Sequence, residues 1–130
     1  MSEPVEQILD RKKLCLIVDD SPTIRKIARR FLSEFGFEVT EAEDGQIGVK
    51  QCELRLPEVI LLDWNMPVMN GIEFLRHLRL MPGGNLPVVI FCTTEGDVSH
   101  ISEAYTAGTN EYLLKPFDRN SLWSKLSAYA

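Results

Sequence analysis

The sequence has no long hydrophobic run and no signal-like leader. Its uninterrupted apolar stretches lie around positions 14–18 and 59–62, far short of the roughly 18 apolar residues that a membrane span needs. The first 13 residues are polar and acidic and contain no apolar segment of the secretory type. We therefore expect a cytoplasmic protein with no membrane span.

Basic blocks are also missing. Fourteen Lys and Arg residues stand against nineteen Asp and Glu residues, so the net charge is -5 and no stretch could neutralise a phosphate backbone. Direct binding of nucleic acid is therefore disfavoured. The chain also has neither a Gly-x-x-x-x-Gly-Lys-Ser/Thr loop nor a Gly-x-Gly-x-x-Gly after its first apolar run, which argues against the common nucleotide-binding enzymes.

Cysteine and histidine are scarce. Cys15, Cys52 and Cys92 are odd in number and lack a Cys-x-x-Cys spacing, so we expect them to be reduced and buried. Neither His77 nor His100 lies near a cysteine at a spacing that suits zinc. We therefore expect no zinc site and interpret both histidines as solvated helix residues.

The remaining composition is that of an ordinary globular domain. The chain has 130 residues, of which 45% are hydrophobic and 25% charged, as expected for one compact domain. We interpret the polar residues 1–12 as an N-terminal extension and place the domain at 13–130.

Apolar runs alternate with helical periodicities along the chain. The runs predict strands at 13–18, 37–42, 59–62, 87–93 and 111–114. Apolar spacings of three and four residues, with capping residues, predict helices at 22–35, 71–80, 98–107 and 118–129, and another between a turn at Asp44-Gly45 and Pro57. Strands separated by helices pair in parallel through right-handed crossovers. The predicted fold class is α/β: a single doubly wound, five-stranded parallel sheet of the flavodoxin-like type, with helices on both faces.

Polar side chains follow four of the five predicted strands. In an open parallel sheet the carboxyl ends of the strands lie at one edge, where ligands bind, so we expect these side chains to meet there. They are Asp19 and Asp20 after the first strand, Asp63 after the third, Thr93, Thr94 and Glu95 at the end of the fourth, and Lys115 after the fifth.

A cluster of carboxylates at this edge predicts a bound cation. Repulsion between two carboxylates costs on the order of 1 kcal/mol at 4 Å in water and more where they are desolvated. Oxygen ligands with room for water suit Mg²⁺. Lys115 and the Thr93 hydroxyl could hold a phosphoryl group on the other side of the pocket. Asp63, at the end of the middle strand, is the candidate nucleophile, and its attack would form an acyl phosphate.

These motifs resemble those of response-regulator receiver domains of bacterial two-component signalling. The resemblance covers the chain from about residue 13 to its end and rests on the order and spacing of four segments. They are Val18-Asp19-Asp20-Ser21, Leu62-Asp63-Trp64-Asn65-Met66-Pro67 with Asn70-Gly71, Thr93, and Lys115-Pro116-Phe117. Two departures stand out, because the family usually has Asp where Asn70 lies and often has Ala where Thr94 lies.

The resemblance implies roles in phosphorylation for particular residues. Asp63 corresponds to the phosphoacceptor. Asp19 and Asp20 correspond to the metal-binding acidic pair, and the backbone carbonyl of Asn65 to a third protein ligand of Mg²⁺. Thr93 and Lys115 correspond to the pair that contacts the phosphoryl oxygens.

The resemblance also implies how the signal is read and how it ends. Movement of the threonine is coupled in the family to an aromatic residue on the fifth strand, here Tyr112. The side chains of Asn65 and Glu95 are at positions that influence how fast the acyl phosphate hydrolyses. Within the family, the chain is most similar to the stand-alone chemotaxis regulators of the CheY type.

The resulting hypothesis is a single-domain response regulator. A histidine kinase would phosphorylate Asp63, and the face formed by the fourth helix, fifth strand and fifth helix would then bind a protein target such as the flagellar switch. We expect no room for a DNA-binding domain after Tyr129, a monomer, and no enzymatic activity beyond the protein's own phosphotransfer and dephosphorylation.

Two alternatives remain open at this point. A receiver could act as a phosphate sink or scaffold in a relay unrelated to motility, and the sequence does not separate that role from a motility switch. An aspartyl-phosphate phosphatase acting on external substrates fits less well. Such phosphatases carry an Asp-x-Asp pair after the first strand, whereas Asp19 and Asp20 are adjacent.

Overall fold

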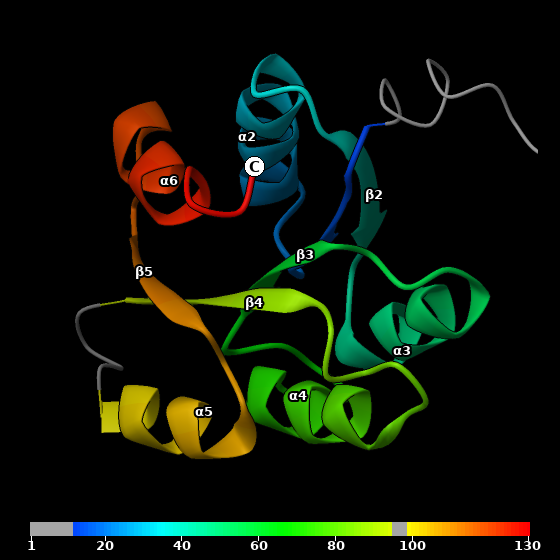
Figure 1. Ribbon diagram of the computed structural model, residues 1–130. Coiled ribbons are helices and arrows are strands. Elements are labelled where there is room, and N and C mark those ends of the chain that lie inside the picture. The colour runs from blue at the N-terminus through cyan, green and yellow to red at the C-terminus, as the bar shows by residue number, and fades with distance from the viewer. Residues whose placement is uncertain (1–11, 95–98) are drawn as a thin grey trace, which may run out of the picture.

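The five strands form one parallel sheet in the order β2-β1-β3-β4-β5 (Figure 1). The computed structural model describes residues 12–94 and 99–130. The strands are β1 (Leu14–Val18), β2 (Glu38–Ala42), β3 (Val59–Asp63), β4 (Val88–Thr94) and β5 (Glu111–Lys115). The helices are α2 (Pro22–Glu34), α3 (Gly45–Leu54), α4 (Gly71–Leu80), α5 (Ile101–Ala107) and α6 (Arg119–Leu126).

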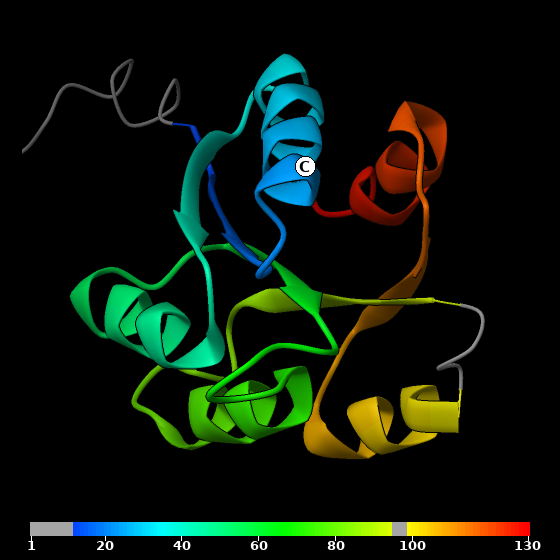
Figure 2. The same cartoon turned by 180° about the vertical axis from the view of Figure 1, so that it is seen from behind.

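Helices cover both faces of the sheet, which confirms the predicted doubly wound fold. α2 and α6 lie on one face, and α3, α4 and α5 lie on the other (Figures 1 and 2). Two buried clusters match these layers: Leu32 of α2 and Leu122 of α6 pack with Ile17, while Phe74 of α4 and Ala104 of α5 pack with other strand residues. Within the described residues, no helix is long and apolar enough to cross a membrane.

Side-chain caps begin four of the helices. The side chains of Ser21, Asp44, Asn70 and Asp118 each accept a hydrogen bond from a backbone N–H in the first turn of the helix that follows, and so satisfy a donor that the helix leaves unpaired. The predicted turn at Asp44-Gly45 was wrong, because Asp44 caps α3 and Gly45 is its first residue.

Other predicted boundaries differ by a few residues. β2 begins one residue later than predicted, β4 extends to Thr94, and α6 ends at Leu126 rather than near residue 129. The predicted start of the fourth helix, Val98, lies outside the described residues.

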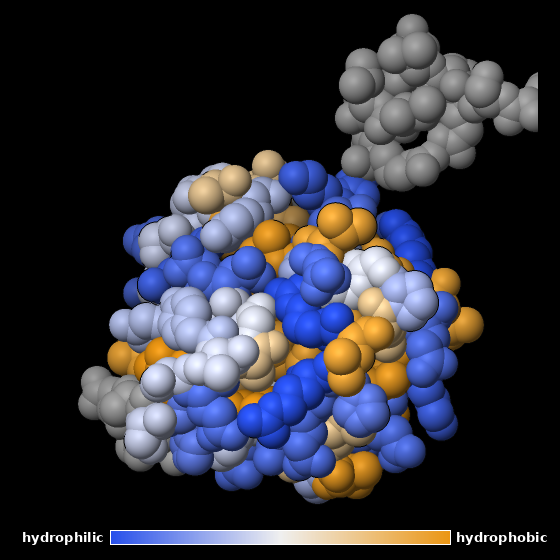
Figure 3. Space-filling model, turned by 60° about the horizontal axis from the view of Figure 1, so that its bottom comes forward, coloured by the Kyte–Doolittle hydropathy of each residue, from blue (hydrophilic) through white to orange (hydrophobic). Residues whose placement is uncertain are grey.

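Three of the most exposed apolar side chains lie away from the carboxyl ends of the strands. Leu54 and Leu80 end α3 and α4 and are 85% and 88% exposed, and Leu86 in the loop before β4 is 81% exposed. On the face shown in Figure 3, apolar side chains lie in separate patches among hydrophilic ones. The three cysteines are buried and unpaired, as predicted.

Candidate functional site

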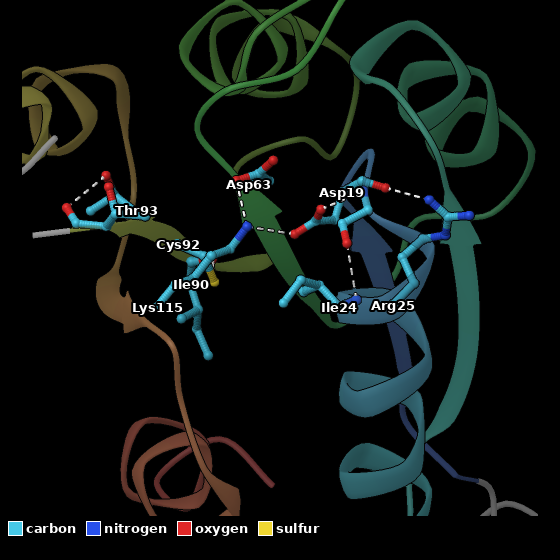
Figure 4. Close-up of polar contacts among 10 residues, drawn as sticks. Asp19, Ile24, Arg25, Asp63, Ile90, Cys92, Thr93 and Lys115 are labelled. Carbon is cyan, nitrogen blue, oxygen red and sulfur yellow. Dashed lines mark hydrogen bonds and ion pairs between the residues drawn. The ribbon is translucent and has the colours of Figure 1, made fainter. Parts of the chain in front are cut away.

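Lys115 joins two carboxylates at the carboxyl edge of the sheet. Its Nζ lies 2.8 Å from Oδ2 of Asp19 and 2.7 Å from Oδ1 of Asp63 (Figure 4). Lys115 and Asp63 are the last residues of β5 and β3, and Asp19 directly follows β1. The long lysine side chain reaches across the end of β4, which lies between β3 and β5. Their side chains are only 15%, 4% and 8% exposed. The structure therefore brings together a partly buried ammonium and two buried carboxylates that come from the ends of separate strands.

Asp20 adds a third carboxylate to the cluster. One carboxylate oxygen each from Asp19, Asp20 and Asp63 can be chosen so that all lie within 4.8 Å of one another, and Asp20 is exposed while the other two are buried. A single ammonium does not balance three carboxylates, so the cluster favours a cation. Carboxylate oxygens open to solvent on one side fit the coordination that Mg²⁺ prefers.

Burial controls the ionisation of Asp63. Desolvation raises the pKa of this carboxyl to about 6; the hydrogen bond and charge of Lys115 lower it, and repulsion from Asp19 and Asp20 raises it further. Burial also acts to lower the pKa of Lys115, but its hydrogen bonds to the two aspartates outweigh that effect and raise it. Lys115 is therefore a cation, and above about pH 6 Asp63 is a carboxylate able to act as a nucleophile.

Asp19 is held through its backbone as well as its side chain. Its Oδ1 accepts a hydrogen bond from the backbone N–H of Ser21 at 2.9 Å, and its own N–H donates to the carbonyl of Ala42 at 3.0 Å. Its backbone carbonyl accepts a hydrogen bond from Nη1 of Arg25 at 2.7 Å (Figure 4). Sequence analysis missed Arg25. The available signal was its position one turn after the Ser21 cap, from which a long side chain can reach back over the helix N-terminus.

Thr93 lies on the same edge but outside the bonded group. It is buried, and its hydroxyl donates a long hydrogen bond of 3.5 Å to the carbonyl of Thr94. Figure 4 shows it on β4, apart from the line of contacts that joins Asp63, Lys115 and Asp19. The structure thus places Thr93 at the edge without bonding it to the carboxylates.

Of the three other predicted site residues, the structure describes Asn65 and Tyr112. Asn65 follows β3 and is exposed. Glu95 lies outside the described residues. Tyr112 is half-buried on β5 in register with Phe91, and Nζ of Lys125 lies 4.8 Å from the centroid of its ring.

The loop after Asp63 contacts the start of α5. Trp64, the residue after Asp63, stacks on His100 with ring centroids 3.8 Å apart. His100, which we interpreted as a solvated helix residue, lies in a 3₁₀ turn directly before α5 and is half-buried, with one ring face packed on Trp64. Gly71 is required where this loop enters α4, because a Cβ there would collide with the backbone carbonyl of Asp63.

Comparison with known proteins decides the family of the chain. Residues 15–127 match the family described as response regulator receiver domain. The chain belongs to this family. The resemblance inferred from the motifs is therefore confirmed.

Two curated relatives are similar over most of their length. The chain is 37% identical to chemotaxis protein CheY-3 of Vibrio cholerae over 123 residues, which are 94% of this chain and 95% of that protein. It is 38% identical to chemotaxis protein CheY1 of Helicobacter pylori over 113 residues, which are 85% of this chain and 91% of that protein. The chain is therefore a CheY-like receiver, as its motifs predicted.

Solved structures agree with this result. The chemotaxis protein CheY4 of Vibrio cholerae superimposes with a TM-score of 0.86 at 31% identity, covering 92% of this chain and 100% of that one. The receiver domain of a sensor histidine kinase from Pseudomonas aeruginosa, solved with a magnesium ion coordinated in its active site cleft, gives a TM-score of 0.83 at 28% identity and covers 92% of this chain and 98% of that one.

Proposed function

We propose that this receiver is a phosphorylation-controlled switch in which Asp63 accepts a phosphoryl group from a histidine kinase. The observation that carries the proposal is the Lys115 ammonium, bonded at once to Asp63 and Asp19. A partly buried cation against the nucleophile neutralises part of the charge that gathers there when a phosphoryl group arrives. Positioning and charge neutralisation are what phosphoryl transfer chiefly requires.

The proposed transfer exchanges one bond to phosphorus for another. A carboxylate oxygen of Asp63 forms a bond to phosphorus, and the bond between phosphorus and the imidazole nitrogen of the kinase phosphohistidine breaks. The electron pair of that bond leaves with the imidazole. Lys115 stays charged throughout, because the hydrogen bonds that it donates to Asp19 and Asp63 raise its pKa. Hydrolysis of the acyl phosphate then returns Asp63 and inorganic phosphate.

Asp19, Asp20 and Asp63 would hold Mg²⁺, with the backbone carbonyl of Asn65 as a further ligand. When bound, the ion would neutralise negative charge on the phosphoryl oxygens. The three clustered carboxylates and the magnesium ion in the related receiver of Pseudomonas aeruginosa support this assignment. The carboxylates would fix the position of the Mg²⁺ ion, and Lys115 would supply the second positive charge beside the phosphoryl group.

The signal would be read on the face formed by α5, β5 and α6. Contact of Thr93 with the phosphoryl group would change its position and, through it, the environment of Tyr112. The side chains of Asn65 and Glu95 would set how long the phosphorylated state lasts. Residues 13–130 would act as the receiver in the cytoplasm, as a monomer, with 1–12 as an extension.

Chemotaxis is the output that the relatives favour. The curated relatives quoted above are chemotaxis proteins, so a flagellar switch protein is the target we expect on this face. Binding of a purified switch component only after phosphorylation would support this output. Phosphorylation without any change in that binding would favour a phosphate sink instead.

Intact mass spectrometry with acetyl phosphate tests the proposal. We expect one phosphoryl group per chain in the presence of Mg²⁺, loss of that group over time, and no uptake with a chelator or in the Asp63→Asn variant. An Asp118→Asn variant is the control, because Asp118 caps α6 and is exposed. Stoichiometric uptake by Asp63→Asn would contradict the assignment, and sustained turnover of an added phosphomonoester would favour a phosphatase.

A further inference from the structure

Arg25 is tied to the acidic pair by a contact that the proposed chemistry does not use. Its Nη1 lies 2.7 Å from the backbone carbonyl oxygen of Asp19, and its Nε lies 3.0 Å from Oε1 of Glu41 on β2. The Arg25 side chain is 16% exposed. An arginine held at both ends of its planar guanidinium is fixed in orientation, which a lysine ammonium at the same place would not be.

The carbonyl that Arg25 binds belongs to the peptide unit that joins Asp19 to Asp20. This unit is planar. Fixing its oxygen therefore fixes the direction in which the chain leaves β1 and enters Asp20. Asp20 is exposed, so the packing around it is less able to set its direction than the packing around Asp19.

Glu41 and Arg29 complete the support around Arg25. Glu41 uses one carboxylate oxygen for Nε of Arg25 and the other for Nε of Arg29, at 3.0 and 2.6 Å. The second arginine also donates to the carbonyl of Val39 at 3.2 Å. Arg29 thus shares the same glutamate but is bonded to β2 and not to the acidic pair. Comparing the two arginines therefore separates the effect of contact with Asp19, which Arg25 makes, from the effect of a positive charge beside Glu41, which both share.

We propose that Arg25 is a positioning residue that orients Asp20 for the divalent cation by holding the peptide between Asp19 and Asp20. This inference rests on the proposed function, since it concerns the metal site of that function. Residues that orient metal ligands commonly change metal affinity by 10- to 100-fold when they are replaced. Arg25 would therefore act on Mg²⁺ affinity and not on the reaction at Asp63, which it does not contact.

Charge and position make opposite predictions for this residue. Because Arg25 is a cation beside a cation site, its charge alone weakens Mg²⁺ binding. If charge were its whole effect, Arg25→Met would bind Mg²⁺ more tightly and Arg25→Lys would match the parent. If position dominates, both variants bind Mg²⁺ more weakly.

A titration of the full chain with MgCl₂ at constant ionic strength, followed by NMR of the backbone amides, separates the two. We expect the dissociation constant to rise about tenfold in Arg25→Lys and Arg25→Met, and to stay within about twofold of the parent in the control Arg29→Gln, since exposed ion pairs contribute little. Unchanged affinity in Arg25→Lys, or tighter binding in Arg25→Met, would overturn the proposal.

Two further measurements keep the test decisive. At saturating Mg²⁺ the Arg25→Lys variant should take up phosphoryl groups from acetyl phosphate at the parent's rate, and a rate that stays low at saturation would overturn a role confined to metal affinity. If the Arg25 variants do not fold, Glu41→Gln replaces them, and it should weaken Mg²⁺ binding about threefold by loosening one end of the guanidinium. Unchanged affinity there would overturn the proposal.

The response of the parent protein to Mg²⁺ distinguishes failure of this inference from failure of the proposed function. A parent protein with no saturable response to Mg²⁺ would remove the metal site itself, and with it the role of Arg25. A parent that binds Mg²⁺ alongside an Arg25→Lys variant of equal affinity would remove the role of Arg25 alone.

Discussion

Lys115 holds Asp19 and Asp63 through contacts of 2.8 and 2.7 Å, whereas Thr93, on the strand between β3 and β5, donates across 3.5 Å to the carbonyl of its neighbour Thr94. The first contacts join charged groups and are short, so they are strong. The second is neutral and long, so it contributes little. The comparison divides the pocket into a fixed acidic side and an adjustable Thr93 side.

The division suits a switch. Groups that meet the phosphoryl group first have to be in place before it arrives, because preorganised charge costs no rearrangement during the reaction. A group that changes conformation after phosphorylation should break only weak interactions when it moves. The reason is that a ligand shifts the equilibrium between two conformations only by the difference between its affinities for them. Thr93 fits the second description, and Lys115 fits the first.

Removing the cation from the fixed side should have the largest effect. Lys115→Met leaves Asp63 without its positive partner, so we expect phosphoryl uptake from acetyl phosphate at saturating Mg²⁺ to slow by about 10²- to 10³-fold. Single-turnover mass spectrometry measures the rate. Lys125→Met is the matched control, because that ammonium covers the ring of Tyr112, and it should react like the parent. A decrease of less than about fivefold in Lys115→Met would show that the fixed side is not built around this lysine.

The raised pKa of Asp63 predicts how stability depends on pH without metal. The pKa is about 6 in the folded protein against an ordinary 3.8, so the folded state holds the proton more tightly than the unfolded state. The contribution of Asp63 to stability is therefore fully present below pH 3.8 and is lost as the pH rises through about 6. At pH 8 in chelator, Asp63→Asn should exceed the parent in free energy of unfolding by on the order of 1–2 kcal/mol.

Urea unfolding at several pH values measures this difference. It should vanish near the ordinary pKa of 3.8 and become smaller at pH 8 when Mg²⁺ is added, because the cation offsets the repulsion among the carboxylates. A parent that is more stable than Asp63→Asn at pH 8 without metal would contradict the raised pKa.

The adjustable side should show the smallest effect on the chemistry. Thr93→Ala removes a long, neutral hydrogen bond, so phosphoryl uptake should stay within about threefold of the parent. The phosphorylation-dependent NMR shifts around Tyr112 should shrink, and Thr93→Ser, which keeps the hydroxyl, should retain them. Loss of uptake in Thr93→Ala would place Thr93 on the fixed side, and a full response at Tyr112 would break the proposed coupling.

Sequence patterns predicted the parts of this pocket that depend on strand periodicity. Each buried apolar run ends at a polar residue, and parallel strands bring those ends to one edge, so Asp19, Asp63, Thr93 and Lys115 could be grouped without a structure. The ion pairs themselves could not be predicted, because they depend on Lys115 reaching across β4.

Features that depend on single long-range or backbone contacts were missed. Arg25 lies one turn after the Ser21 cap, but it binds a backbone carbonyl, which any residue supplies, so the sequence does not identify its acceptor. The stacking of His100 on Trp64 joins two loops. Val68 adopts a φ of 69°, a conformation that disfavours a β-branched residue, and nothing in its own sequence neighbourhood predicts that.

Locating the phosphoryl group at residue level tests the central claim most directly. The protein phosphorylated with acetyl phosphate and Mg²⁺ is treated with borohydride, which reduces an acyl phosphate to the alcohol, and peptide mass spectrometry then finds the reduced position. We predict reduction at Asp63 and at no other carboxylate. Reduction at Asp19 or Asp20, or no Mg²⁺-dependent reduction, would contradict the assignment of Asp63 as the phosphoacceptor.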